Sequence, residues 1–144
     1  MGNSPYSGVV TWIGQYVVAA LVFGVLDFLW LGKIGRPLYD ARLGDLIADR
    51  PAMGPALAFY ALYVVGITYF VTHPAISSGS WVAALGGGAL FGLVAYATWN
   101  LTNLAVLRDW PSSIVPIDMA WGTAATAITA VVTYAICQAV PWLH

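Results

Sequence analysis

Two aspartates lie within long apolar stretches of this sequence, and they are its clearest candidates for chemistry. Asp27 and Asp118 each stand about one helical turn from the end of such a stretch. Glutamate is absent, so an internal acid, base or cation ligand must be an aspartate, a tyrosine or a neutral amide. A central aspartate in a membrane helix costs roughly 2.5–3.5 kcal/mol on insertion scales, and such residues commonly handle protons, ions or ligands. The pair therefore predicts a polar site inside an apolar protein.

Amide and indole side chains are expected to join the two aspartates in one layer. Two asparagines near the end of the third apolar stretch share a helix face at i,i+3 spacing. Among the tryptophans, Trp121 is the better candidate for lining a pocket, whereas Trp30 and Trp110 fit an aromatic belt at a membrane surface. The predicted ligand-binding residues are Asp27, Asn100, Asn103, Asp118 and Trp121.

The same residues also have a purely structural interpretation. Interhelical hydrogen bonds from asparagine and aspartate hold membrane bundles together. A carboxylate one turn from the interface can be hydrated, or can accept a hydrogen bond from Arg108 or Lys33. The sequence leaves the functional and the structural interpretations open.

The composition excludes several classes of protein. Of the 144 residues, 60% are hydrophobic and 8% are charged, whereas a soluble domain carries about 25% charged residues. A net charge of -1 leaves no basic surface to neutralise phosphates, so we expect no nucleic acid partner. One cysteine, Cys137, and two distant histidines, His73 and His144, do not make a disulfide or a metal cluster. We expect no metal and no cofactor, and membrane lipids as the surroundings.

Four apolar stretches are long enough to cross a hydrocarbon core, which needs roughly 20 helical residues. None of them shows the alternating pattern of a membrane β-barrel. We therefore predict an all-α integral membrane protein, a single domain over residues 1–144 built as a bundle of four transmembrane helices. Residues 1–7 carry no positive charge, so the first helix is expected to be retained and not cleaved as a signal peptide. The predicted spans are 9–31, 52–71, 81–107 and 114–139.

The basic residues predict an orientation. All five lie in the connection between the first and second spans or in the one between the third and fourth. The positive-inside rule places these connections in the cytoplasm and both termini outside. Apolar residues at helical spacing between Pro37 and Pro51 predict a short interfacial helix over about residues 38–48, bounded by the two prolines.

Small residues in the third span predict close helix packing. Gly88 and Gly92 form a small-xxx-small pattern, which lets another backbone approach. The partner is either another helix of the same chain or a second copy of it, so a homodimer is one expectation.

Several motifs together resemble a bacterial membrane-protein family, domain of unknown function 2177. The resemblance rests on segments 27–31, 59–63, 91–111 and 118–123 and covers essentially the whole chain. It implies a helical protein of the bacterial inner membrane and names no activity. Asp27, Asn103 and Asp118 match the family pattern. Asn100 departs from it, because that position is usually an aspartate after a tyrosine, and this weakens any mechanism that needs an acid or base there.

Three functions fit these observations. The first is a protein that binds or transports a proton, a cation or a small amphiphile at the polar layer, as a homodimer if four helices make too thin a conduit. The second is an accessory or structural subunit of a larger membrane complex. The third is a lipid-modifying enzyme, with Asp27 or Asp118 as general base and Asn103 steadying an oxygen. No covalent nucleophile, metal cluster or cofactor motif supports a reaction type, so we favour binding or transport over catalysis.

Overall fold

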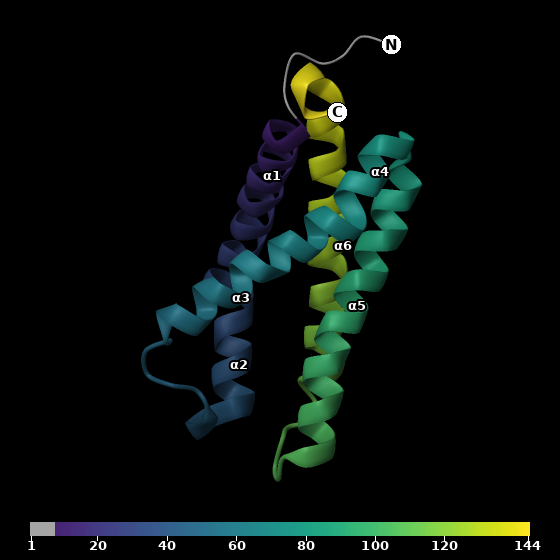
Figure 1. Cartoon of the computed structure of the whole chain (residues 1–144). Helices are drawn as coiled ribbons and strands as arrows, with labels where there is room; N and C mark the ends of the chain where they lie inside the picture. The colour runs from purple at the N-terminus through teal and green to yellow at the C-terminus, as the bar shows by residue number, and fades with distance from the viewer. Residues whose placement is uncertain (1–7) are drawn as a thin grey trace.

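The computed structural model describes residues 8–144, so residues 1–7 of the expected domain lie outside the described residues. The chain forms four long helices that run alternately up and down, which confirms the predicted fold class (Figure 1). All four are long and apolar enough to cross a membrane. Within the described residues there are helices and connecting turns but no strand.

The first helix is longer than the sequence analysis expected. It consists of α1 (Gly8–Leu29), the π-helical segment η1 (Trp30–Gly35), α2 (Arg36–Leu43) and a last 3-10 turn, η2 (Gly44–Leu46). The backbone stays helical at both junctions of η1. The helical residues expected as a separate interfacial helix over 38–48 are therefore a continuation of the first span.

The second helix is built in the same way. It consists of α3 (Met53–Gly66), the π-helical segment η3 (Ile67–Thr72) and α4 (His73–Ser78), where the sequence predicted an end near Val71. The third and fourth helices, α5 (Trp81–Val106) and α6 (Val115–Ala139), lie close to their expected bounds. A final 3-10 turn, η4 (Pro141–Leu143), follows α6.

Both π-helical segments end two residues before a proline, which explains why neither proline ends its helix. Pro37 and Pro74 stand at the start of the α-helical segments that follow η1 and η3. Proline has no N–H to donate to the carbonyl four residues earlier, and its ring clashes with that carbonyl. Local π-helical turns re-satisfy the freed carbonyls of membrane helices. Pro37 therefore lies inside the first helix and does not mark its boundary.

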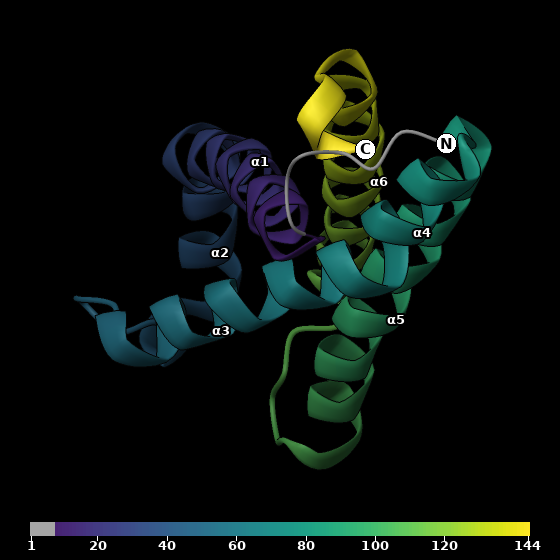
Figure 2. The same cartoon turned by 45° about the horizontal axis from the view of Figure 1, so that its top comes forward.

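Close backbone contact joins α5 to α6. A Cβ on Gly88 would lie 2.9 Å from Ala127 Cα, and a Cβ on Gly92 would overlap the carbonyl oxygen of Gly122. The predicted packing glycines thus lie against a helix of the same chain. The first helix packs against α6, and the second crosses the other three obliquely with η3 at the crossing (Figure 2).

The bundle has two distinct ends. The end formed by residues 44–52 and 107–114 is called the loop end below. At the opposite end, called the terminal end, η4 folds back onto the start of α1. There Thr11 donates a hydrogen bond to the Trp142 carbonyl (3.0 Å) and Gln15 donates one to the Leu143 carbonyl (2.7 Å). These bonds hold the fourth helix against the first.

Candidate functional site

Asp118 is the centre of a buried hydrogen-bond network near the loop end. It lies in the first turn of α6, where the positive end of the helix dipole favours a carboxylate, and only 9% of it is exposed. Asn100 of α5 donates from Nδ2 to Asp118 Oδ2 at 2.6 Å, and the hydroxyl of Tyr39 donates to Oδ1. Three of the four long helices therefore meet at this one carboxylate.

Tyr39 is the functional candidate that the sequence analysis missed. It lies between Pro37 and Pro51, in the segment that was expected to form a separate interfacial helix. It lies 12 positions after Asp27, which in a plain α-helix would put the two about a third of a turn apart. The wider turn of η1 rotates Tyr39 back toward the face of Asp27. Pro37 is the feature of the sequence that could have revealed this. Interpreted as a proline after a π-helical turn inside a longer helix, it would have placed Tyr39 on the first span.

Two stacked tryptophans form one wall of this network. The rings of Trp30 and Trp121 lie 4.3 Å apart and almost parallel, at 6°. The indole N–H of Trp30 also donates to the hydroxyl oxygen of Tyr39 at 3.3 Å, which orients that hydroxyl toward Asp118. Trp121 thus lies beside the Asp118 network. Trp30, expected in the surface belt, instead packs on it inside the bundle.

Asp27 lies beside this network without a strong partner of its own. Its carboxyl group is half-buried and interacts electrostatically with the Asp118 carboxyl group and with the Trp121 indole. The Trp121 N–H is buried and makes no hydrogen bond of ordinary geometry within the described residues. Asp27 and Asp118 are therefore two neighbouring acids in an apolar bundle.

No cation neutralises this pair of acids within residues 8–144. The ion pair found there joins Arg36 to Asp40 at 3.8 Å on the exposed face of α2. Lys33 and Arg108, which the sequence analysis offered as partners for a carboxylate, are both exposed. The partners of Asp118 are the neutral donors Asn100 and Tyr39.

Asn103 lies near the network but is not bonded to it. It is 8% exposed, and its Nδ2 has no hydrogen-bond partner among the described residues. Asn103 is one turn from Asn100 toward the loop end of α5. The structure therefore brings together Asp27, Asn100, Asp118 and Trp121, and leaves Asn103 as a buried donor beside them.

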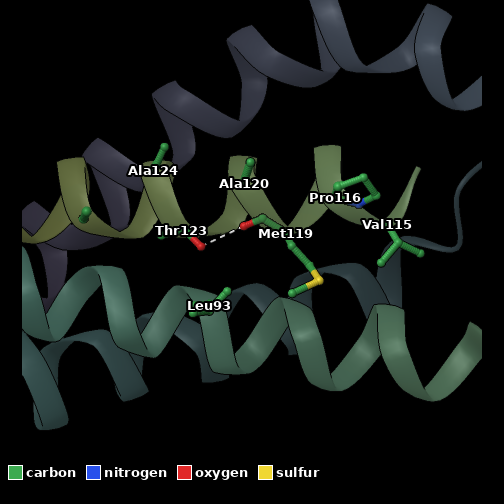
Figure 3. A pocket seen from close by; sticks show the side chains of 8 residues that line it. Leu93, Val115, Pro116, Met119, Ala120, Thr123 and Ala124 are labelled. Atoms are coloured by element: carbon green, nitrogen blue, oxygen red, sulfur yellow. Dashed lines mark hydrogen bonds between the residues drawn. The ribbon is translucent and has the colours of Figure 1, made fainter. Parts of the chain in front are cut away.

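An apolar groove on the surface of the bundle is separate from these polar groups. It holds about 580 Å³ on the outer side of α5 and α6, and its wall is almost entirely apolar (Figure 3). The hydroxyl of Thr123 points into the helix backbone here and donates to the Met119 carbonyl at 2.8 Å. The residues that line the groove are Leu93, Val115, Pro116, Met119, Ala120, Thr123, Ala124 and Ala127.

Comparisons with known proteins place the chain in a family. It is 28% identical over 95 residues to NADH-quinone oxidoreductase subunit N of Salinibacter ruber. That alignment covers 58% of this chain and 19% of the relative, so the chain spans only a small part of that subunit. No solved structure is significantly similar to the chain. Residues 12–135 match the family described as a predicted membrane protein, domain of unknown function 2177, and the chain therefore belongs to it, as its motifs predicted.

Proposed function

We propose that this protein binds a proton at the Asp27–Asp118 pair, as the proton-binding site of a transport protein. One observation carries the proposal: a buried carboxylate that is bonded to two neutral donors lies beside a second acid, and no cation of the described residues is paired with either. Two close carboxyl groups in an apolar setting favour a shared proton, because two negative charges repel each other there.

The donors around Asp118 suit a proton better than a metal ion. A cation needs several oxygen ligands. Here Asn100 and Tyr39 present N–H and O–H groups to the carboxylate, and these stabilise its negative charge when the proton leaves. The pair can thus alternate between one and two negative charges with little rearrangement of its neighbours.

The proposed location is the bacterial inner membrane, with the loop end in the cytoplasm and both termini outside. All five basic residues belong to the loop end or to the helical segments that lead into it. The site would then exchange its proton with the cytoplasmic side. A homodimer is part of this proposal, because four helices offer little room for a substrate path.

Infrared difference spectroscopy between acid and neutral pH tests the site. The wild-type protein should show a carboxyl C=O band that titrates. Tryptophan fluorescence measured over the same pH range should show a change in the emission of the Trp30–Trp121 stack. Asp118→Asn should lose both signals. The matched control is Asp109→Asn, an exposed aspartate near the same end whose φ of 60° asparagine also tolerates, and it should keep both signals.

A pH response in Asp118→Asn equal to that of the wild type would overturn the proposal. Native mass spectrometry of the same pair adds a separate check. A metal ion or an amphiphile that is retained by the wild type and lost in Asp118→Asn would assign the site to that ligand in place of a proton.

A second candidate function is a subunit of a larger membrane complex. The similarity to a subunit of NADH-quinone oxidoreductase favours it, and so does the apolar groove, in which Ala120 and Ala124 leave room for another helix. Gentle extraction followed by native mass spectrometry separates the two functions. A second polypeptide bound to the chain supports the subunit role, and a chain that arrives alone counts against it.

A further inference from the structure

A line of buried polar residues continues from Asp118 along the inner face of α6. Thr126, Thr129 and Thr133 follow it at spacings that keep them on one helix face, and each is fully buried at 0% exposure. At 1.5 Å per residue, Thr133 lies about 22 Å from Asp118 along the helix. The buried threonine hydroxyls of α6 therefore begin about 12 Å from Asp118 along the helix and continue toward the terminal end.

The second helix places two more threonines opposite this line. The hydroxyls of Tyr63 and Thr126 lie 2.8 Å apart, and Gln138 Nε2 donates to the Ile76 carbonyl at 3.1 Å. These two bonds align the helices, which run in the same direction, at both ends of η3. Thr68 and Thr72 of η3 are 2% and 0% exposed, and η3 packs against α6.

Three of these hydroxyls are buried without a hydrogen-bond partner in the part of the chain that the structure describes. Threonine in a membrane helix usually bonds to the carbonyl four residues earlier, as Thr126 does with Gly122 at 2.7 Å. The hydroxyl oxygens of Thr68, Thr129 and Thr133 make no hydrogen bond within residues 8–144 and are inaccessible to solvent. Unpartnered buried hydroxyls are unfavourable, so a cluster of three points to a use that this conformation does not satisfy.

Polar groups also continue beyond η3 to the terminal end. His73 directly follows Thr72, stacks on Trp12 at 3.8 Å between ring centroids, and bonds through Nδ1 to Gln15 Oε1 at 2.9 Å. Gln15 is 1% exposed and His73 is half-exposed. Titratable groups thus stand beyond both ends of this row of threonines, the Asp27–Asp118 pair at one end and the half-exposed His73 at the other.

We propose that these threonines form a proton path between the Asp27–Asp118 site and His73, seen here in its closed state. The hydroxyl line consists of Thr68, Thr72, Thr126, Thr129 and Thr133. Water completes the path when η3 shifts, since a π-helical segment has weaker bonding geometry than the α-helix around it and commonly occurs at functional sites. Titratable groups at both ends favour protons over metal cations as the conducted species.

Conduction along this path leaves the protein unchanged. Each hydroxyl or water oxygen accepts a proton from one neighbour and releases its own to the next, so one proton enters at the acid pair and one leaves at His73. The charge moved is balanced by a counter-ion that crosses the membrane separately. At the Asp27–Asp118 pair this path rests on the proposed function, whereas the hydroxyl line has a test of its own.

Proton flux into liposomes tests the path. The protein is reconstituted with a trapped pH-sensitive dye, and a potassium gradient with valinomycin supplies the counter-ion and the driving force. Thr129→Val should reduce the flux at least tenfold, and Thr129→Ser should restore it. Thr123→Val is the matched control, because Thr123 lies on the same helix beside the outer groove (Figure 3), and it should conduct like the wild type.

Thr133→Val is made in parallel in case Thr129→Val does not fold, and each variant is compared with the wild type by size-exclusion chromatography. Flux in the folded valine variants equal to that of the wild type overturns the path, as does a wild type that conducts no protons. The proposed proton site at Asp27 and Asp118 is tested by a different measurement. It is wrong if Asp118→Asn keeps its infrared titration, whatever the threonine variants do.

Discussion

The hydroxyl of Tyr39 donates a hydrogen bond to the Asp118 carboxylate across 79 positions of the sequence. This bond joins the last α-helical segment of the first helix to the first turn of the fourth. Tyr39 reaches this bond through η1, which carries the first helix past Pro37. The candidate site therefore depends on an irregular turn as much as on its polar side chains.

Removing the Tyr39 hydroxyl should destabilise the loop end. Tyr39→Phe deletes a hydrogen bond to a carboxylate, and such bonds contribute about 1.5–3 kcal/mol. We expect a loss of that size in the free energy of unfolding, measured by denaturant titration in mixed micelles. Tyr69→Phe is the control, since Tyr69 is 59% exposed, and it should change stability little. Equal stability of Tyr39→Phe and the wild type would show that the bond contributes nothing.

Placing an aspartate at position 100, as the resemblance to the family implies there, should make stability depend on pH. Asn100→Asp places a third carboxyl group at the position that now bonds Asp118 at 2.6 Å. The groups repel when both are ionised. The unfolded chain then holds fewer protons than the folded one, so stability relative to the wild type should fall as the pH rises.

Thermal unfolding of Asn100→Asp and the wild type between about pH 5 and pH 8 measures this effect, across the range where model carboxyl groups are mostly ionised. Asn100→Leu is the companion variant. Its stability should be lower than that of the wild type by about the same amount at every pH, because it removes a hydrogen-bond donor to Asp118 without adding a charge. A flat pH profile for Asn100→Asp would contradict the prediction.

Adding one methyl group at Gly92 should weaken the contact between α5 and α6. In Gly92→Ala the new Cβ would overlap the Gly122 carbonyl and lie 2.8 Å from Thr126 Cβ. Overpacking of this kind costs typically 1–3 kcal/mol. Gly86→Ala is the matched control on the same helix, because a Cβ there meets nothing within 4 Å, and it should be neutral or slightly stabilising.

The terminal end offers a comparison of a buried and an exposed hydrogen bond. Gln15→Leu leaves the Leu143 carbonyl without its 2.7 Å bond, and Thr11→Ala removes the exposed 3.0 Å bond to Trp142. We expect Gln15→Leu to cost about 1–3 kcal/mol and Thr11→Ala distinctly less. Digestion by carboxypeptidase reports the loosening of η4 directly. Faster digestion of Thr11→Ala than of Gln15→Leu would reverse the expected order.

The four spans could be predicted because hydropathy is a local property of the sequence. The spans also predicted that Asp27, Asn100 and Asp118 lie close together. Consecutive helices run in opposite directions, so residues near the same end of the bundle lie at one depth. Orientation in the membrane also rests on local charge, and it stays a prediction.

Features that depend on contacts between helices could not be derived in this way. Trp30 has the spacing of a surface tryptophan, and only the stacked ring of Trp121 identifies it as interior. Gly88 and Gly92 signal close packing without naming the partner, which proves to be α6 of the same chain. The buried threonines of α6 did show helical spacing in the sequence, but their unpartnered hydroxyls appear only in three dimensions.

The length of the inner face of α6 has an electrical consequence. A charge that moves from the level of Asp118 to that of Thr133 travels about 22 Å, against a hydrocarbon core of about 30 Å. It therefore crosses most of the membrane potential, at about 2.3 kcal/mol per 100 mV for the full drop. A charge that reaches only Asp118 from the loop end crosses little of it. Proton binding at the acid pair should thus be nearly independent of voltage, while passage beyond it is driven or opposed by the cell's potential.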